Sequence, residues 1–363
     1  MTNVVSPTLF LVFAVVFTHG CDSQHDGRRS EAAAVSTERL GSVPRSPWIQ
    51  GRDGGSSGLA FGRSIWVFGD TVLNEPDGTG TQWHTNSFAQ TEIDQWLATG
   101  FTTPTDAAGA PNFFVDLTAD EKAWDAQHAA EACETPPCST RWALWPGAPV
   151  YDEASRTAWI LYGLYNDHQP SGIGIASWKG LDQPVQRHRI GDSWLLFPSH
   201  ELEWANAPLA HDGYLYAFAC PRDDWDHTCR LGRAPLESPD DRTTWRYFDG
   251  ETWSPVSSRA ATLFNGAPIM SASFVAAIDR WLVIYSEPFS EDIVLRSAPD
   301  LVGPWSAPAV LFAEHGEPPY DVVHHPELEQ DGGLVQYVTY SQPTSNGWFG
   351  AEHVLWRVVL EPQ

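Results

Sequence analysis

Short apolar runs separated by turn-forming residues dominate the chain. The clearest are SIWVFGDT, TAWILYGLY, GYLYAFA, RWLVIYSE and LVQYVTYSQ, each close to Gly, Pro, Asp or Asn. Runs of this length that are rich in aromatic and β-branched residues are typical of β-strands. One stretch, residues 119–132, predicts a helix, with Thr118 or Asp120 as its cap. We therefore expect an all-β protein.

The strands form a unit that recurs: a short strand, a polar turn, and a second strand with aromatic residues near its end. The units start near Gly58, Pro149, Pro208, Ser273 and Pro326, in steps of about 91, 59, 65 and 53 residues. Repeats of this size are typical of propeller blades. The pattern predicts a five-bladed β-propeller, a single domain over residues 48–363, with an inserted loop and short-helix region near 86–140. A two-sheet sandwich is the alternative, but it has less reason to repeat one hairpin.

The first unit, GRDGGSSGLAFGRSIWVFGDT, carries Asp53 and Asp70 near the two ends of one hairpin. A two-residue turn at Gly62 and Arg63 suits the type II′ geometry and would place Gly55 opposite Asp70. Asp53 shares the face of Gly55, so the two aspartates would be diagonal neighbours with backbone positions roughly 7 to 8 Å apart. A bulge or a three-residue turn would instead put them on opposite faces.

Two carboxylates that face one glycine-lined space suit glycoside hydrolysis. One acid protonates the leaving oxygen, and one carboxylate acts as base or nucleophile. The alternative is structural: Asp70 caps a turn through backbone hydrogen bonds, and Asp53 is a turn residue or a partner of Arg52.

Further candidates follow from the repeat. Asp53, Glu203 and Asp321 each lie five residues before a unit start. If that offset is meaningful, three acids from different blades face the central funnel; acids are common enough here for the offset to arise by chance. Alternation would direct at most one of His324 and His325 into the funnel. The full set of substrate-binding or auxiliary candidates is Arg52, Trp145, Glu203, Trp204, Asn206, Asp321, His324, His325 and Glu327.

Charge narrows the classes of partner. The chain has 46 Asp and Glu against 21 Lys and Arg, a formal charge of −25, which disfavours nucleic acid and anionic membrane surfaces. The sequence contains neither a phosphate-binding glycine loop followed by Lys and Ser or Thr nor an HExxH motif. We expect no required cofactor and no catalytic metal. A structural calcium ion at the acidic cluster of residues 223–226 is an alternative to a solvated hairpin tip.

The N-terminal residues predict export. Residues 1–21 read as a signal peptide whose apolar run precedes Gly20 and Cys21. Lipidation at Cys21 and plain secretion both stay open, and a lipid anchor would be the only membrane contact. Residues 22–47 are polar and patternless, which predicts a flexible tether.

Four cysteines remain in a compartment expected to be oxidising. The simplest of the three possible pairings joins Cys133 to Cys138 and Cys220 to Cys229. Zinc is the competing interpretation, and the spacings do not suit it.

Three segments together resemble a known family: WIQGRDGGSSGLAFGRSIWVFGDT, FVAAIDRWLVIYSEPFSEDIVLRSAPDLVGPWS and HHPELEQDGGLVQYVTYSQP. They look like the domain of unknown function 4185, which includes glycoside hydrolase family 183, five-bladed propellers containing endo-D-arabinanases. The resemblance implies Asp53 and Asp70 as the catalytic pair, with Glu203 and His325 as further site residues.

The hypothesis is an exported glycoside hydrolase that cleaves an arabinan-like, furanoside-containing polysaccharide. The alternatives are a non-catalytic carbohydrate-binding propeller and a cell-surface interaction scaffold.

Overall fold

The computed structural model describes residues 32–128, 140–167, 169–221, 227–316 and 318–361. Several sequence expectations concern residues outside these ranges: the signal peptide, lipidation at Cys21, the Cys133–Cys138 pair and a calcium site at residues 223–226. The described part of the chain contains no helix long and apolar enough to cross a membrane.

Strands are the main regular structure of the described residues. They are β1 (Ala34–Ser42), β2 (Ile49–Ala60), β3 (Arg63–Leu73), β4 (Trp83–His84), β5 (Ser87–Thr91), β6 (Trp142–Pro146), β7 (Val150–Asp152), β8 (Thr157–Asn166), β9 (Gln169–Trp178), β10 (Gln186–Arg187), β11 (Phe197–Pro198), β12 (Asn206–His211), β13 (Tyr214–Ala219), β14 (Thr228–Pro235), β15 (Arg246–Phe248), β16 (Trp253–Ser254), β17 (Phe264–Asn265), β18 (Ser271–Val275), β19 (Arg280–Ser286), β20 (Asp292–Ala298), β21 (Ala309–Ala313), β22 (Tyr320–His324), β23 (Val335–Thr344) and β24 (Gly347–Leu360). The α-helices are α1 (Trp96–Thr99) and α2 (Ala119–His128). Short 3-10 helices are η2 (Arg242–Thr244), η3 (Ser257–Arg259), η4 (Ala276–Ile278), η5 (Pro326–Leu328) and η6 (Asp331–Gly333).

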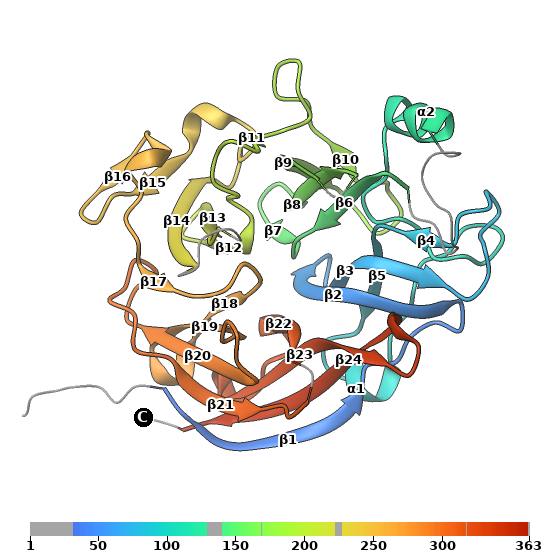
Figure 1. Ribbon diagram of the computed structural model, residues 1–363. Helices are drawn as coiled ribbons and strands as arrows, with labels where there is room; N and C mark the ends of the chain where they lie inside the picture. Colours follow the sequence, from blue (N-terminus) through green and yellow to red (C-terminus); the bar gives the residue numbers. More distant parts are fainter. Residues whose placement is uncertain (1–31, 129–139, 168, 222–226, 317, 362–363) are drawn as a thin grey trace, which may run out of the picture. The chain divides into compact units, whose positions relative to one another are not determined.

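The strands form five antiparallel sheets, which are the blades of the expected five-bladed β-propeller. Each blade contains one of the repeated hairpins: β2–β3, β7–β8, β12–β13, β18–β19 or β22–β23. Figure 1 looks along the central axis and shows the first strand of every blade innermost. The all-β fold class and the repeat are thereby confirmed.

The core is divided among the contacts between neighbouring blades. Ile65 and Val67 of β3 pack with Ile160 of β8, whereas Trp66 and Phe68 of β3 pack with Tyr337 of β23. Because both faces of a blade are buried in this way, its second strand is apolar at consecutive positions rather than at alternate ones. Trp66, Trp178, Trp204 and Trp245 are fully buried, which gives a structural role to several of the tryptophans.

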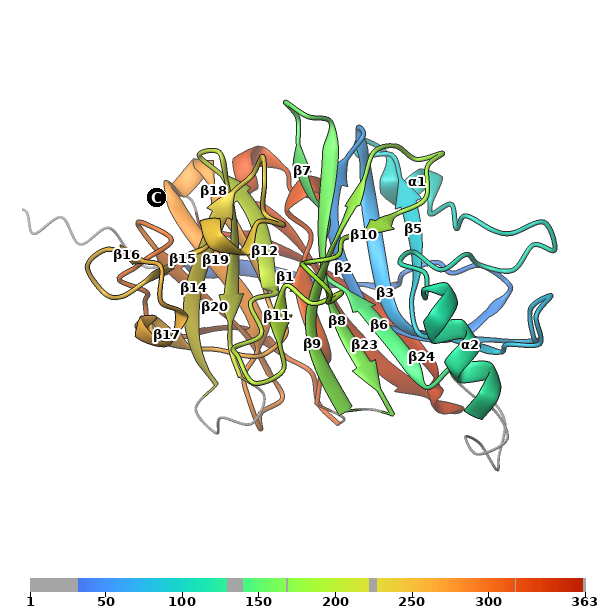
Figure 2. The same ribbon diagram turned by 90° about the horizontal axis from the view of Figure 1, so that it is seen from above.

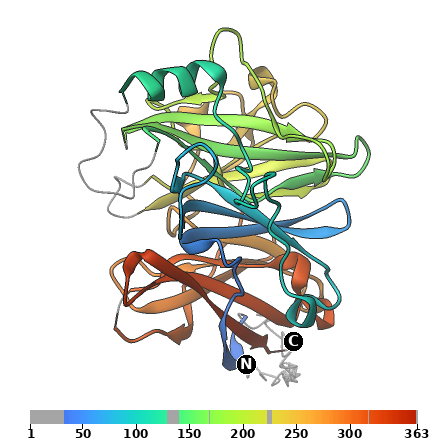
Figure 3. The same cartoon turned by 90° about the vertical axis from the view of Figure 1, so that its right-hand side faces the viewer.

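The segment expected to be a flexible tether is partly a strand. β1 pairs antiparallel with β24 from Ala34↔Leu360 to Ser42↔Val354 and is the outer strand of the last blade. Figure 3 shows this blue N-terminal strand beside the red C-terminal strands. The prediction failed because a strand at the edge of a sheet keeps its polar side chains in solvent and needs little apolar patterning.

The inserted region contains the expected helix and one strand that we did not expect. β5 pairs with β3 over Ser64↔Thr91 to Phe68↔Ser87 and therefore belongs to the first blade. Helix α2 begins after Thr118, whose hydroxyl accepts the N–H of Glu121 at 3.2 Å while the Glu121 carboxylate accepts the N–H of Thr118 at 2.8 Å. This is a reciprocal capping box. Figure 2 shows α2 beside β6.

The second predicted disulfide is confirmed, because Cys220 is bonded to Cys229. The bond joins the residue after β13 to the second residue of β14, and both cysteines lie in the apolar contact between the third and fourth blades.

Candidate active site

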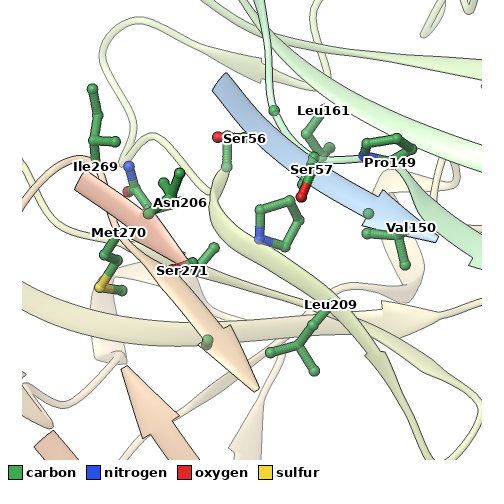
Figure 4. Close-up of a pocket in the computed structure, with 18 of the residues that line it drawn as sticks. Ser56, Ser57, Pro149, Val150, Leu161, Asn206, Leu209, Ile269, Met270 and Ser271 are labelled. Atoms are coloured by element: carbon green, nitrogen blue, oxygen red, sulfur yellow. The ribbon is translucent and has the colours of Figure 1, made fainter. Parts of the chain in front are cut away.

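A pocket of about 650 Å³ lies on the axis of the propeller and is lined by residues from the first strands of all five blades. Figure 4 shows part of its wall: Ser56 and Ser57 come from β2, Val150 from β7, Asn206 and Leu209 from β12, and Ser271 from β18. Asp53, Asp70, Trp145, Glu203, Asn206, Asp321, His324 and Glu327, all predicted from the sequence, also line it.

The turn of the opening hairpin lies one residue earlier than expected. Ala60 pairs with Arg63, so the turn residues are Phe61 and Gly62, with φ of 53° and 74°. Positive φ at both positions is characteristic of a type I′ turn. Phenylalanine rarely adopts this conformation, but its ring packs edge-to-face with Tyr151 and Trp178 at centroid distances of 5.1 and 5.0 Å. Packing against the second blade therefore overrides the local turn preference.

Asp53 and Asp70 face each other across two opposed bulges rather than as diagonal neighbours. Between the pairs Arg52↔Thr71 and Gly54↔Phe68, Asp53 alone stands opposite Gly69 and Asp70. Gly55 is then the extra residue on β2, which restores the register at Ser56↔Val67. The two irregularities aim both aspartates into the pocket from one hairpin.

Glycine at position 69 makes room for the Asp53 side chain. A Cβ atom at Gly69 would lie 2.6 Å from Asp53 Oδ1, well inside van der Waals contact. Gly54 and Gly55 have φ of 78° and 98°, in the left-handed region that glycine adopts without strain. The glycines of GRDGGSS and FGDT are thus part of the geometry that holds the carboxylate.

Asp321 brings a third carboxylate to the same place from the last blade. Its Oδ2 accepts the backbone N–H of Gly54 at 2.9 Å. Asp321 itself has φ of 57° and lies in a register shift between Tyr320↔Ser341 and Val323↔Thr339. A non-glycine residue held in the left-handed region is a local strain that often marks a functional site.

The surroundings favour the protonated form of Asp53. Burial of the carboxyl raises its pKa well above the ordinary value, and the negative charges of Asp321 and Asp70 raise it further. Backbone N–H groups at Asp70 and Asp53 offset part of the effect. Asp53 is therefore suited to carry a proton under conditions where an ordinary aspartate is ionised.

Asp70 is held by an aromatic side chain of the second blade. The indole N–H of Trp145 donates to Asp70 Oδ1 at 3.3 Å, and the Trp145 ring packs on Tyr165 at 4.1 Å. An N–H donor stabilises a carboxylate in its charged form. The two aspartates thus have different environments, one that favours the acid and one that supports the anion.

The histidine pair separates as alternation predicts. His324 lines the pocket, and its ring is hydrogen-bonded to Ser271 at 2.5 Å and Ser273 at 2.8 Å. Burial lowers the pKa of His324 to about 3, so the ring is neutral. His325 faces the contact between blades, where it stacks on Trp66 and bonds to Ser57 and Thr339.

The predicted role of His325 as a site residue is therefore corrected, and the same holds for Arg52 and Trp204. The guanidinium of Arg52 is buried on the far side of β2, 3.5 Å from the centre of the Phe68 ring. Its burial lowers its pKa to about 9. Trp204 is fully buried against Tyr247. Each residue is adjacent in sequence to a residue that lines the pocket. For Arg52 in β2, alternation along the strand directs the side chain the other way, whereas Trp204 lies in the turn before β12.

Two other predicted residues have clear contacts within the protein. Asn206 bridges blades, because its amide donates to the Pro268 carbonyl and accepts the N–H of Cys220 at 3.0 Å. Glu327 accepts a hydrogen bond from Ser64 at 2.5 Å, and burial raises the pKa of its carboxyl. Both shape the pocket wall.

Sequence reasoning missed the pocket residues Tyr165, Tyr320, Ser271 and Ser273. Tyr165 and Tyr320 could have been found, since one ends an aromatic strand and the other directly precedes Asp321. The serines carry no such signal. Among the described residues, no group of three or more His, Cys, Asp or Glu side chains is placed to hold a metal ion.

This site can supply a proton and a carboxylate to one bound molecule. Asp53, whose pKa is raised, and the Asp70 carboxyl group both line the pocket, and acid-assisted cleavage of a glycosidic bond requires two such groups.

Comparison with known proteins agrees with the fold and with the resemblance. The family described as domain of unknown function DUF4185 matches residues 176–348, so the expected resemblance is confirmed over that range. No curated protein matches the sequence.

Solved structures share the propeller fold at low sequence identity. A protein from Bacteroides ovatus described as a hydrolase is 15% identical, with a TM-score of 0.55 over 88% of this chain and 87% of that one. A family 43 β-1,3-galactosidase is 13% identical, with a TM-score of 0.54 over 89% of this chain and 62% of that one.

An exo-β-1,3-galactanase from Phanerochaete chrysosporium is 11% identical, with a TM-score of 0.53 over 88% of this chain and 64% of that one. The chain thus spans less than two thirds of the length of the galactosidase and the galactanase.

Proposed function

We propose that the protein is an exported glycoside hydrolase that cleaves an arabinan-like, furanoside-containing polysaccharide. The observation that carries the proposal is the pair Asp53 and Asp70, which face one pocket across opposed bulges of a single hairpin. The raised pKa of Asp53 supports its role as the proton donor.

The chemistry follows from the two environments. The Asp53 carboxyl gives its proton to the glycosidic oxygen as the bond to the anomeric carbon breaks. The Asp70 carboxylate either removes a proton from the attacking water or attacks the anomeric carbon itself, and water completes the cleavage. The spent Asp53 carboxylate regains a proton in the course of turnover.

The finer parts of the proposal have separate support. Hydrolysis of a glycoside is supported by the fold shared with a β-1,3-galactosidase and an exo-β-1,3-galactanase. The proposal that the substrate contains furanosides is supported by the resemblance of the quoted segments to glycoside hydrolase family 183. Export rests on the apolar run and cysteine within residues 1–21.

The test is release of reducing sugar by the purified chain from arabinan, arabinogalactan and β-1,3-galactan. The variants are Asp53→Asn and Asp70→Asn, and the control is Asp182→Asn, which changes an exposed aspartate outside the pocket. We expect the wild type and the control to cleave an arabinan-containing substrate and both pocket variants to lose most of that activity. Activity that survives both pocket changes would refute the assignment.

The same panel separates the enzyme from a carbohydrate-binding propeller. A binding propeller would retain the polysaccharide on an affinity gel and release no sugar from it, and Asp53→Asn would leave retention unchanged.

A further inference from the structure

Two exposed aromatic side chains stand together in the last blade, and one of them, Tyr320, lines the pocket. Tyr320 is 43% exposed and Trp348 is 50% exposed, and their rings meet edge-to-face with centroids 5.4 Å apart. Large aromatic surfaces left in solvent beside a pocket commonly mark a place where a ligand binds.

The last blade brings the two residues together from distant parts of its sheet. Tyr320 is the first residue of β22, and Trp348 is the second residue of β24, directly after the turn that joins β23 to β24. Gly347 closes this turn with φ of 65° and pairs with Thr344. Both residues lie beside shifts in strand register, which fall between Tyr320 and Val323 in β22 and between Gln342 and Thr344 in β23.

The pair continues the wall that holds the carboxylates. Tyr320 and Asp321 line the pocket side by side. The Asp321 carboxylate is bonded to Gly54, the residue after Asp53. A molecule bound at Asp53 and extended toward the last blade therefore meets the Tyr320 ring, and the exposed Trp348 ring packs directly against Tyr320 just beyond the pocket lining.

The charge of the pocket restricts the ligand. The described lining residues include seven carboxylic acids, Asp53, Asp70, Glu153, Glu203, Asp321, Glu327 and Glu329, and neither lysine nor arginine. Uronic acids, sulfated sugars and phosphosugars would meet repulsion without a compensating cation. A neutral sugar meets no such penalty, and its C–H face can pack on an aromatic ring.

We propose that Tyr320 and Trp348 form a subsite that stacks against a neutral sugar unit of the polysaccharide, beyond the units held at Asp53 and Asp70. This inference rests on the proposed function, since it assumes that a saccharide occupies the pocket. The inference adds a second site of contact between the protein and the polysaccharide, and it predicts that the substrate carries no charge.

Phe349 offers a matched control in the same hairpin. It is 42% exposed, but alternation along β24 turns its ring to the other side, where it packs on Trp83 at 5.4 Å. Truncation of Phe349 removes a ring that is about as exposed as that of Trp348 and lies one position further along β24. The Tyr320–Trp348 pair stays in place.

The experiment is calorimetric titration of linear arabinofuranosyl and β-1,3-galactosyl oligosaccharides of increasing length into the full chain. All variants carry Asp53→Asn to prevent turnover. We expect Trp348→Ala to weaken binding of the longest bound oligosaccharide about three- to tenfold, in line with the loss of one aromatic stacking contact. Binding of the shortest should be unchanged, Trp348→Tyr should retain most of the affinity, and Phe349→Ala should match the parent. A glucuronate-containing oligosaccharide of equal length should bind more weakly than its neutral counterpart.

Equal affinity of Trp348→Ala and the parent at every length would overturn the inference, as would an equal loss by Phe349→Ala or the absence of binding by every neutral oligosaccharide. Failure of the proposed function gives a different result. Trp348-dependent binding with no hydrolysis by the wild type would preserve the subsite and refute the enzyme, whereas hydrolysis with Trp348-independent binding would refute only the subsite.

Discussion

Asp53 and Asp70 are two ordinary aspartates that acquire different properties from their surroundings. Gly69 lets the Asp53 side chain lie against β3, and Trp145 donates a hydrogen bond to Asp70. Asp321 adds a negative charge that raises the pKa of Asp53. The same residue type therefore has a raised pKa at one position and accepts an indole N–H hydrogen bond at the other.

This arrangement predicts how activity depends on pH. Asp53 must be protonated to act, so activity should fall as pH rises through its raised pKa. Asp321→Asn removes a neighbouring negative charge, which should lower the pKa of Asp53 and move this alkaline limb to lower pH. The amide oxygen of the variant can still accept the Gly54 N–H, so the local geometry is retained. A pH profile of kcat/KM checks the shift.

An alkaline limb that stays at the same pH in Asp321→Asn would show that Asp321 does not set the protonation of Asp53. Glu291→Gln is the control, because Glu291 is paired with His315 at the surface and lies outside the pocket lining. Its profile should match that of the wild type.

Pocket residues were predicted correctly from the sequence where several features of the sequence pointed to the same position. Asp53, Asp70 and Asp321 were found through the hairpin, the offset within the repeat and the glycines around them, and all three line the pocket. Arg52, Trp204 and His325 were proposed from their positions beside other candidate residues and, for His325, also from the family resemblance, but none of the three lines the pocket. Proximity in sequence says little about side-chain direction in a strand, since adjacent side chains point to opposite faces.

Elements with strong local signals were predicted well. The five hairpins and the start of α2 follow from apolar runs, turn residues and the capping residue Thr118. The register of the first hairpin could not be predicted in this way. Phe61 occupies a turn position with positive φ, which phenylalanine rarely adopts, and contacts with the second blade stabilise it there. The edge strand β1 was missed because its stability comes from pairing with β24 rather than from its own sequence.

At the scale of elements, α2 is attached to the second blade by a buried ion pair. Glu121 and Arg187 lie 2.5 Å apart, with side chains 8% and 5% exposed. Glu121→Gln would leave the guanidinium buried without its counter-ion, which typically costs about 3 kcal/mol or more. Urea denaturation should therefore show a clearly lower free energy of unfolding.

The matched comparison is Lys122→Met, one residue along the same helix. Lys122 pairs with Asp116, and both side chains are more than half exposed, at 54% and 56%. Exposed pairs contribute at most about 1 kcal/mol. Equal losses from the two variants would contradict the assignment of the Glu121–Arg187 pair as the structural attachment.

For the described propeller, β1 links the N-terminal part of the chain to the last blade. A variant that begins at Val43 should lose all nine residues of β1, seven of which pair with β24, and expose the edge of β24. We expect a markedly lower melting temperature and aggregation, measured by circular dichroism and light scattering.

A variant that begins at Ser30 retains β1 and serves as the control; its stability should equal that of the full chain. If removal of β1 proved harmless, residues 34–42 would be the flexible tether that their composition suggests.

The most direct measurement of the central claim compares substrates with poor and good leaving groups. Asp53→Asn and Asp70→Asn are assayed on the polysaccharide that the wild type cleaves and on a 2,4-dinitrophenyl glycoside of the same sugar. Loss of a general acid typically costs about 10² to 10⁴ in rate. We predict such a loss for Asp53→Asn on the polysaccharide and near wild-type rates on the dinitrophenyl glycoside, whose leaving group needs no proton. Asp70→Asn should be impaired on both. Equal impairment of Asp53→Asn on the two substrates would contradict the assignment of Asp53 as the proton donor.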